Sequence, residues 1–109
     1  MEKALQAKSL SNRQLRLLDL MQRLNFGRVE GLVIRDSEPD FTKPPRVFRD
    51  VKFGGENGPH PKAGKGDFLL KEQVCDLFAQ FERMGDGIVL CLEVKHGLPF
   101  RMTIEEEAT

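Results

Sequence analysis

The longest irregular stretch of the chain collects several side chains that could bind an anion or a partner. Residues 54–66 read GGENGPHPKAGKG and contain Asn57, His60, Lys62 and Lys65 as hydrogen-bond donors. Glycines let a backbone approach a ligand closely, and the stretch leads into a predicted helix whose first N–H groups favour anions. Connections of this length are either mobile or functional. The four side chains are therefore candidates for ligand binding, and a simple connecting segment is the alternative.

The same stretch does not form a phosphate-binding P-loop. That motif reads G-x-x-x-x-G-K-[ST], and its last hydroxyl holds magnesium. Gly64 and Lys65 are present, but Pro59 stands five residues before Gly64, and Gly66 follows Lys65. Asp67, the expected N-cap of the next helix, would also repel an anion. An enzyme that uses this loop is an alternative that the pattern does not favour.

Metal binding and nucleophilic catalysis are not indicated by the spacing of soft ligands. These ligands are His60, His96, Cys75 and Cys91, and no two of them lie at the two-to-four-residue spacing typical of zinc sites. Both cysteines fall in apolar patterns that predict buried, reduced thiols. We therefore expect no metal, no cofactor and no catalytic residue.

Two carboxylates, Glu30 and Glu93, lie in the middle of predicted strands. A glutamate in a strand either pairs with an arginine or faces solvent, because an unpaired buried carboxylate is costly. The partners that we expect are Arg46, Arg49 and Arg101. A structural ion pair is favoured over acid–base catalysis at both positions.

A basic cluster on the first predicted hairpin is a second candidate surface, with Phe48 among its charges. Basic side chains contact phosphates and an aromatic ring can stack on a base. The sequence pI of about 6.7 is lower than that expected of a dedicated nucleic-acid binder. Nucleic-acid binding is therefore the second interpretation, with the candidate residues Arg28, Arg35, Arg46, Phe48, Arg49 and Lys52.

An internal similarity predicts how these residues are positioned. Residues 17–39 align with residues 77–99 without a gap and share 6 identities in 23 positions, where about one or two are expected by chance. Both segments read as a helix, a glycine, a strand and a turn. The identities are Leu17/Leu77, Arg23/Arg83, Gly27/Gly87, Val29/Val89, Leu32/Leu92 and Pro39/Pro99.

The periodicity of apolar residues predicts two helices and four strands. Ser11 and Gln14 form a capping-box pattern at the start of the first helix, and Gly27 is expected to end it. Asp67 is the expected N-cap of the second helix, and His96-Gly97 is a hairpin turn. The predicted helices are 12–25 and 68–84, and the predicted strands are 28–35, 46–53, 87–95 and 100–105.

This order, α-β-β-α-β-β, predicts an α+β fold made by internal duplication. We expect one domain over residues 1–109, with units of about 10–53 and 67–105. Each unit is too small to bury its own apolar face. Two helices should therefore lie on one face of a four-stranded, mostly antiparallel sheet.

Strict alternation along the strands would leave an apolar area on the other face of the sheet. That face would carry Val29, Val33, Val89 and Cys91, joined by Phe48. An apolar sheet face is typical of an interaction surface, although scattered exposed apolar residues are common. We expect a homodimer that pairs either face to face or edge to edge, with these five residues as interface candidates.

Composition limits the remaining classes of function. No run of about 18 apolar residues is present, so we expect no membrane span, and the first residues lack the apolar core of a secretory signal. A cytoplasmic location is the expectation. Residues 1–66 hold 13 Lys and Arg against 8 Asp and Glu, and residues 67–109 hold 4 against 9. This asymmetry suits self-association or a basic binding face with an acidic rim.

The segment LLDLMQRLNFGRVEGLVIRDSEP resembles small uncharacterised bacterial proteins. They begin with a leucine-rich helix, followed by F/Y-G-x-V, an apolar strand and a turn. The resemblance covers about 30 residues and implies an αββ unit and a bacterial source. It implies no activity, cofactor or catalytic residue. The sequence thus predicts a non-catalytic binding or assembly module, homodimeric, with nucleic-acid binding as the alternative.

Overall fold

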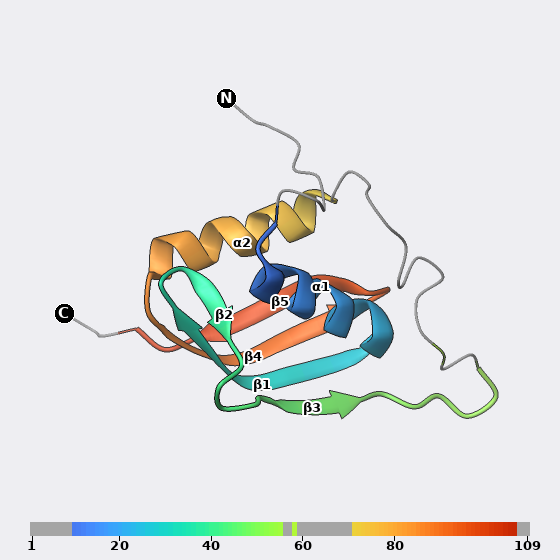
Figure 1. Cartoon of the computed structure of the whole chain (residues 1–109). Coiled ribbons are helices and arrows are strands. Elements are labelled where there is room, and N and C mark those ends of the chain that lie inside the picture. The colour runs from blue at the N-terminus through green and yellow to red at the C-terminus, as the bar shows by residue number, and fades with distance from the viewer. Residues whose placement is uncertain (1–9, 56–57, 59–70, 107–109) are drawn as a thin grey trace.

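The computed structural model describes residues 10–55, 58 and 71–106, which form an α+β fold. Two helices lie on the same side of five strands that form one mostly antiparallel sheet (Figure 1). The elements are α1 (Asn12–Leu24), β1 (Gly27–Arg35), β2 (Glu38–Asp40), β3 (Arg46–Arg49), α2 (Glu72–Met84), β4 (Gly87–Lys95) and β5 (Leu98–Ile104).

The first helix begins as its capping signal predicts but ends earlier than expected. The Ser11 side chain accepts a hydrogen bond from the N–H of Gln14, whose side chain accepts one from the N–H of Ser11. The helix ends at Leu24, and Asn25 follows in a left-handed conformation with φ of 65°. The prediction that Gly27 ends the helix was therefore wrong, because Gly27 is the first residue of β1.

The second helix begins at Glu72, later than the predicted residue 68. Lys71 is its N-cap residue and provides no side-chain hydrogen bond. The predicted N-cap, Asp67, lies outside the described residues. Both helices are 13 residues long, and neither has the length and apolar character needed to cross a membrane.

The sheet has five strands because the second strand of the first hairpin is interrupted. β1 and β4 pair antiparallel at the centre, and β5 pairs with β4. On its other edge, β1 pairs with β2 over residues 33–35 and with β3 over residues 27–30. Pro44 and Pro45 lie between β2 and β3. Proline has no N–H to donate, so this segment leaves the ladder and returns to it.

Two tight turns connect the long strands to their hairpin partners. Asp36 and Ser37 have φ values of 55° and 68°, and His96 and Gly97 have values of 56° and 72°. Positive φ at both central residues is typical of two-residue hairpin turns. The predicted turn at His96-Gly97 is confirmed, and β2 lies in a segment that was predicted to be an irregular connection.

A bulge in each central strand reverses the predicted alternation of side chains. The β1–β4 register is the same on both sides of the bulge, from Glu30–Cys91 to Leu32–Val89, but Gly31 and Leu90 between these pairs belong to no pair of the ladder, and Gly31 has φ of 74°. The β4–β5 register shifts between residues 89 and 91. An extra residue in a strand shifts the alternation by one position. Val29 and Val89 are consequently fully buried, whereas Ile88 and Leu90 are about half exposed.

A second shift in the β4–β5 register changes the position of Phe100. The pairs Val94–Pro99 and Glu93–Arg101 leave Phe100 between them, and its side chain is 56% exposed. Strict alternation along the predicted strand 100–105 places Phe100, Met102 and Ile104 in the core, and for Phe100 this prediction was wrong. Met102 and Ile104 pack against the core as the alternation predicts.

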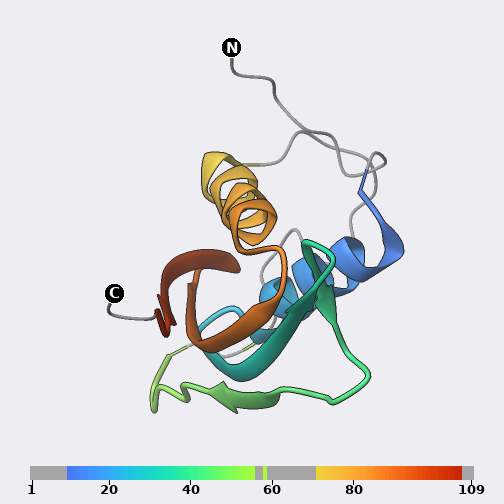
Figure 2. The ribbon, with the colours of Figure 1, turned by 90° about the vertical axis from the view of Figure 1, so that its left-hand side faces the viewer.

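One hydrophobic core lies between the helices and the sheet. The strands curve beneath the two helices (Figure 2), and each of the long elements contributes buried side chains. Such a shared core is what holds the two helices against the central strand pair. Its members are Leu17, Leu18, Met21, Leu24, Val29, Leu32, Ile34, Val74, Leu77, Phe78, Phe81, Val89, Leu92 and Val94.

Candidate binding surface on the open face of the sheet

The sheet face opposite the helices, called the open face here, carries two rows of side chains that cross four strands. Cross-strand partners point to the same side of a sheet. The row Val47, Val29, Leu92 and Met102 faces the helices. The neighbouring rows therefore lie on the open face, and they consist of Phe48, Arg28, Glu93 and Arg101, and of Arg46, Glu30, Cys91 and Thr103.

Phe48 lies between two arginines at the β3 end of these rows. The guanidinium of Arg28 is 4.3 Å from the centre of the Phe48 ring, and that of Arg46 is 5.1 Å away. Arg28 also donates a hydrogen bond of 2.7 Å to Glu30. This hydrogen bond is the main cause that raises the pKa of Arg28 above its ordinary value. The Phe48 cluster is therefore cationic at every physiological pH.

A second aromatic ring with cations lies at the β5 end. The ammonium of Lys95 is 4.0 Å from the centre of the Phe100 ring, and the guanidinium of Arg101 is 5.9 Å away. Arg101 donates a hydrogen bond of 3.0 Å to Glu93. An exposed cation over an aromatic ring stabilises by about 0.5–1 kcal/mol. Both edges of the open face thus present a phenyl ring held beside positive charge.

The two carboxylates that lie within strands are both paired with arginines. Glu93 pairs with Arg101, as predicted. Glu30 pairs with Arg28, two residues before it on β1, and its register partner on β3 is Arg46. Paired, partly exposed carboxylates of this kind organise neighbouring guanidinium groups more than they stabilise the fold.

Cys91 lies at the centre of the open face and is a free thiol. Burial is the main cause that raises the pKa of the Cys91 thiol, and the negative charges of Glu30 and Glu93 raise it further. A thiol with a raised pKa is protonated at neutral pH and is a weak nucleophile. This position therefore does not favour a nucleophile, but the prediction of a buried core thiol was wrong for Cys91, which is half-buried on the open face.

The structure brings together three of the six residues predicted to contact nucleic acid. Arg28, Arg46 and Phe48 form the cluster described above. The other three make contacts elsewhere: Arg35 pairs with Asp40 at 2.9 Å, Arg49 donates to the carbonyl oxygen of Leu24 at 2.9 Å, and Lys52 lies 6.0 Å from the ring of Phe26.

Arg35 and its neighbours stabilise the first hairpin. Thr42 donates a backbone hydrogen bond of 2.9 Å to Asp40, and Arg35 binds the other carboxylate oxygen. The hydrogen bonds from Thr42, with that from Arg35, lower the pKa of Asp40 to about 2. Arg49 donates to main-chain carbonyls at the C-terminal end of α1, a common role of arginine at that position.

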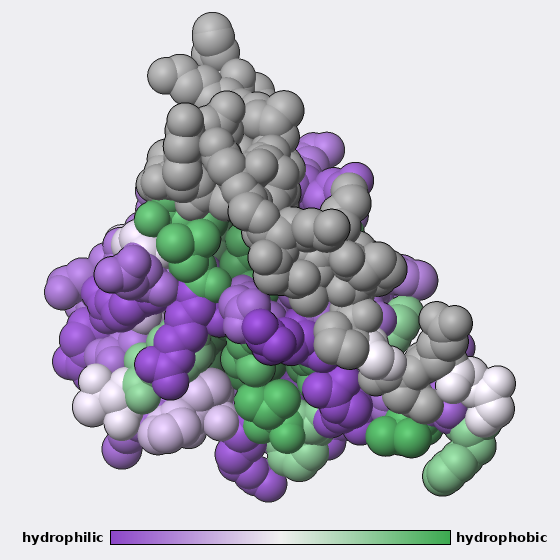
Figure 3. Space-filling model, turned by 45° about the vertical axis from the view of Figure 1, so that its right-hand side comes forward, coloured by the Kyte–Doolittle hydropathy of each residue, from purple (hydrophilic) through white to green (hydrophobic). Residues whose placement is uncertain are grey.

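The predicted dimer interface does not form a single apolar surface. Val29 and Val89 are core residues, so their assignment to the uncovered face was wrong. Val33, Phe48 and Cys91 are half-buried. Figure 3 views another side of the molecule, where hydrophobic and hydrophilic areas lie side by side. Within the part of the chain that the structure describes, the large exposed hydrophobic residues belong to β3 and the residues after it, to β4 and to β5, and are Val47, Val51, Phe53, Ile88, Leu90 and Phe100.

The candidate ligand-binding loop lies mostly outside the described residues. Asn57, His60, Lys62 and Lys65 are among the residues that the structure does not describe. Gly58 is described, and its carbonyl oxygen accepts a hydrogen bond of 3.2 Å from the side chain of Asn25. Among residues 10–55, 58 and 71–106, no group of three His, Cys, Asp or Glu residues could hold a metal ion.

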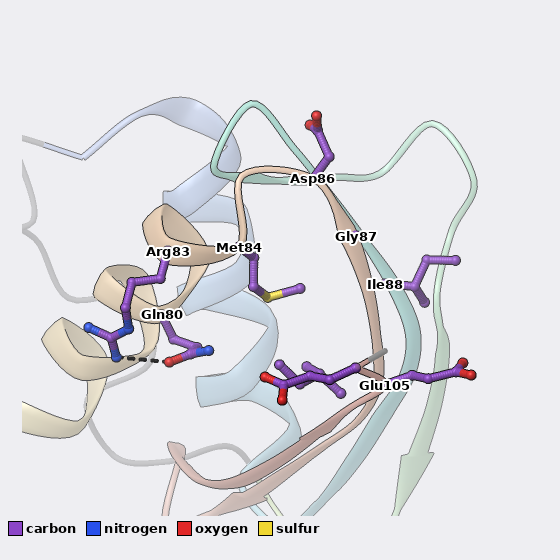
Figure 4. A pocket seen from close by; sticks show the side chains of 9 residues that line it. Gln80, Arg83, Met84, Asp86, Gly87, Ile88 and Glu105 are labelled. Carbon is purple, nitrogen blue, oxygen red and sulfur yellow. Dashed lines mark hydrogen bonds between the residues drawn. The ribbon is translucent and has the colours of Figure 1, made fainter. Parts of the chain in front are cut away.

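A groove runs between α2 and β5 at the edge of the sheet. One hollow of about 210 Å³ is lined by Leu77 and Gln80 of α2 and by Phe100 and Met102 of β5, among others. A second hollow, of about 390 Å³, lies nearer the end of α2 (Figure 4). Its lining includes Gln80, Arg83, Met84, Asp86, Gly87, Ile88, Ile104, Glu105 and Glu106.

Three residues of the second aromatic cluster, at the β5 edge of the sheet, were missed as candidates in the sequence. Lys95, Phe100 and Arg101 form the second aromatic cluster, although Phe100 was predicted to be buried. The only local signal for this cluster is that Phe100 and Arg101 are adjacent in β5, and strict alternation placed their side chains on opposite faces of the sheet. The register shift before Arg101 exposes the ring, and neither periodicity nor composition encodes that shift.

Comparison with known proteins adds no family to this description. The chain matches no family model, no curated protein and no solved structure. The similarity of residues 17–39 to small bacterial proteins stays an expectation from the sequence.

Proposed function

We propose that this protein is a non-catalytic binding and assembly module that forms a homodimer through the outer edge of β5. The observation that carries the proposal is that the outer edge of β5 is not covered by another described strand. β5 spans seven residues and pairs with β4, and it pairs with no other strand of the described chain. The unpaired N–H and C=O groups of a long edge strand are a template for another strand.

The opposite edge of the sheet is poorly suited to such pairing. β2 and β3 have only three and four residues and are separated by a segment with two prolines. Pro39 also removes one N–H from β2. Short, proline-containing edge strands prevent pairing between molecules. β5 has one proline, Pro99, at its second position, so most of its outer edge can accept a partner.

The side chains of β5 favour one register for a symmetric pair. With Thr103 on the two-fold axis, antiparallel pairing at the C-terminal end of β5 places Met102 opposite Ile104 of the second copy, and Arg101 opposite its Glu105, which directly follows β5. Opposite charges and apolar side chains in such positions stabilise a strand pair. Met102 and Ile104 are only partly buried and border the groove beside α2. A second strand would cover both.

The register predicts which engineered cysteine forms a disulfide across the axis. In a variant with Cys75→Ala and Cys91→Ser, Thr103→Cys places two thiols directly opposite each other. Their Cα atoms would be about 4.5–5.5 Å apart, within disulfide range. We expect Thr103→Cys to form a covalent dimer under mild oxidation, measured by non-reducing electrophoresis.

Arg101→Cys in the same background is the matched control. Two copies of residue 101 would lie about 13 Å apart in this register, so Arg101→Cys should stay largely uncross-linked. Equal cross-linking of the two variants, or light scattering that detects only a monomer at micromolar concentration, would overturn the proposed dimer.

A charge exchange tests the same register without oxidation. Glu105→Arg would place two arginines opposite each other at both symmetric positions. We expect the Kd of the dimer to rise about tenfold. A cross-strand pair of opposite charges contributes about 0.2–1 kcal/mol, and the variant replaces both symmetric pairs by repulsive ones. Adding Arg101→Glu should restore dimerisation, measured by analytical ultracentrifugation. A double variant as weak as Glu105→Arg would contradict the register.

We also propose that the chain consists of two related αββ units, residues 10–53 and 67–105. The bounds of α1 and β1 lie sixty residues before those of α2 and β4, and β2 begins sixty residues before β5. The N–H of Ser37 donates to Gly85 O at 2.7 Å, and the N–H of Gly97 donates to Asn25 O at 3.0 Å. Each contact is the counterpart of the other, because Ser37 corresponds to Gly97 and Asn25 corresponds to Gly85, sixty residues later. An experimental structure in which residues 12–35 and 72–95 do not superimpose would contradict the duplication.

A cytoplasmic location forms part of the same proposal. Cys75 and Cys91 are both free thiols in the structure. Free thiols are typical of reducing compartments. Fractionation of cells that express a tagged chain should recover it with cytoplasmic markers, and recovery in a secreted fraction would contradict this location.

A further inference from the structure

We infer that the open face binds single-stranded nucleic acid between Phe48 and Phe100. The row that contains Phe48, Arg28, Glu93 and Arg101 crosses four adjacent strands. Neighbouring strands are about 4.8 Å apart, so the row is about 14 Å long. Phe100 directly precedes Arg101, so an aromatic ring stands at each end of a row of charges.

Cations lie over the face of each ring, so an unpaired base would stack either on the uncovered ring face or on the guanidinium plane above the ring. Phe48 is half-buried and Phe100 is 56% exposed. The rings are flanked by Arg28 and Arg46 at one end and by Lys95 and Arg101 at the other. Stacking on aromatic side chains together with backbone contacts from basic residues is how single strands are bound with little sequence preference.

Basic side chains outnumber acidic ones in the open-face rows, although the chain as a whole has no net charge. The two open-face rows and Lys95 contain four basic side chains against the two carboxylates Glu30 and Glu93. Three acidic residues of the second half, Glu72, Asp76 and Glu82, lie exposed on α2, while Glu105 and Glu106 line a hollow beside Ile88 and Leu90, away from the Phe48 cluster. A neutral chain can therefore present a positive face, and phosphate contact depends on the local field rather than on the pI.

The two carboxylates favour a single strand over a duplex. Glu30 and Glu93 fix the guanidinium groups of Arg28 and Arg101 through hydrogen bonds of 2.7 and 3.0 Å. They would repel phosphates packed directly above them, as in a duplex groove, but they can accept hydrogen bonds from base amino groups. Bases are free to stack on Phe48 and Phe100 only when they are unpaired.

The test uses the full chain and fluorescence anisotropy with a labelled 12-nucleotide single strand of mixed sequence, as DNA and as RNA. We expect binding at 50 mM salt that weakens steeply at 200 mM. Phe48→Leu and Phe100→Leu should each weaken binding about 5- to 100-fold, in line with the loss of one stacked base. Arg46→Ala should lower the slope of log K against log salt by about 0.7.

Phe53→Leu is the matched control, because Phe53 is 98% exposed but lies outside the two rows. Its binding should equal that of the wild type, and circular dichroism confirms that all variants are folded. Undetectable binding at 50 mM salt would overturn the inference. Equal affinity for a blunt duplex or for heparin would overturn it as well, and so would equal loss in Phe53→Leu and Phe48→Leu. The assay does not require the dimer, so its outcome is independent of the cross-linking result for Thr103→Cys.

Discussion

At the scale of single residues, two glycines in β1 decide where neighbouring strands can lie. A Cβ atom on Gly27 would collide with the carbonyl oxygen of Phe48, which pairs with the next residue of β1. Gly31 has φ of 74°, and a Cβ atom there would meet nothing within 4 Å among the described atoms. The first glycine therefore provides space for β3, and the second provides the backbone conformation of the bulge.

Alanine substitutions separate these two roles. Gly27→Ala should destabilise the protein by about 2 kcal/mol or more, because β3 must move away from β1. Gly31→Ala should destabilise it by about 1 kcal/mol, since only the left-handed conformation is penalised. Urea denaturation followed by circular dichroism measures both values. A Gly27→Ala variant that is no less stable than Gly31→Ala would contradict the close approach of β3.

At the scale of elements, the helix ends show how far local signals reach. The Ser11–Gln14 capping box is present as the sequence predicts. The Ser11 hydroxyl also donates a hydrogen bond of 2.9 Å to the carboxylate of Glu38 on β2. The N-cap residue of α2 is instead Lys71, whose side chain cannot accept a hydrogen bond from the first turn. The first helix is therefore fixed by a local motif, whereas the second depends more on the packing of its buried face.

Exchanging the caps should change stability in opposite directions. Ser11→Ala should destabilise the protein by about 1 kcal/mol, and Lys71→Ser should stabilise it by about 0.5–1 kcal/mol. Thermal unfolding followed by circular dichroism measures both shifts. Lys71→Ala is the control for the loss of the lysine charge, because alanine cannot cap. Equal stability of Lys71→Ser and Lys71→Ala would contradict a missing cap at α2.

At the scale of the whole molecule, the sheet separates a shared core from a charged face. Both helices and both central strands bury side chains in one core, while ion pairs and aromatic rings occupy the open face. The bulges decide which residues belong to which layer. Val89 and Leu90 are neighbours in β4, yet one is fully buried and the other is 45% exposed.

This separation can be tested with two adjacent alanine substitutions. Val89→Ala should destabilise the protein by about 2 kcal/mol, because it removes buried methyl groups and leaves a cavity. Leu90→Ala removes a larger side chain but should change the free energy of unfolding by less than about 0.5 kcal/mol, as exposed positions do. Chemical denaturation compares the two. A larger effect at Leu90 would contradict the placement of the bulge.

The sequence by itself determined the parts of this protein that depend on local periodicity. It predicts an α+β fold with two helices, the first capping box, the turn at His96-Gly97 and the Glu93–Arg101 pair, because each depends on residues that are close in the chain or on a clear apolar period. It also predicts Arg28, Arg46 and Phe48 as a group.

Only the tertiary structure decided which face each strand residue occupies. The bulge at Gly31 and the shifts along β4 and β5 moved Val29 and Val89 into the core and exposed Phe100. A shift of one residue reverses the direction of every later side chain, and it depends on pairing with a strand far away in the sequence. For the same reason, the charged rows of the open face and the unpaired edge of β5 become visible only when the strands are assembled.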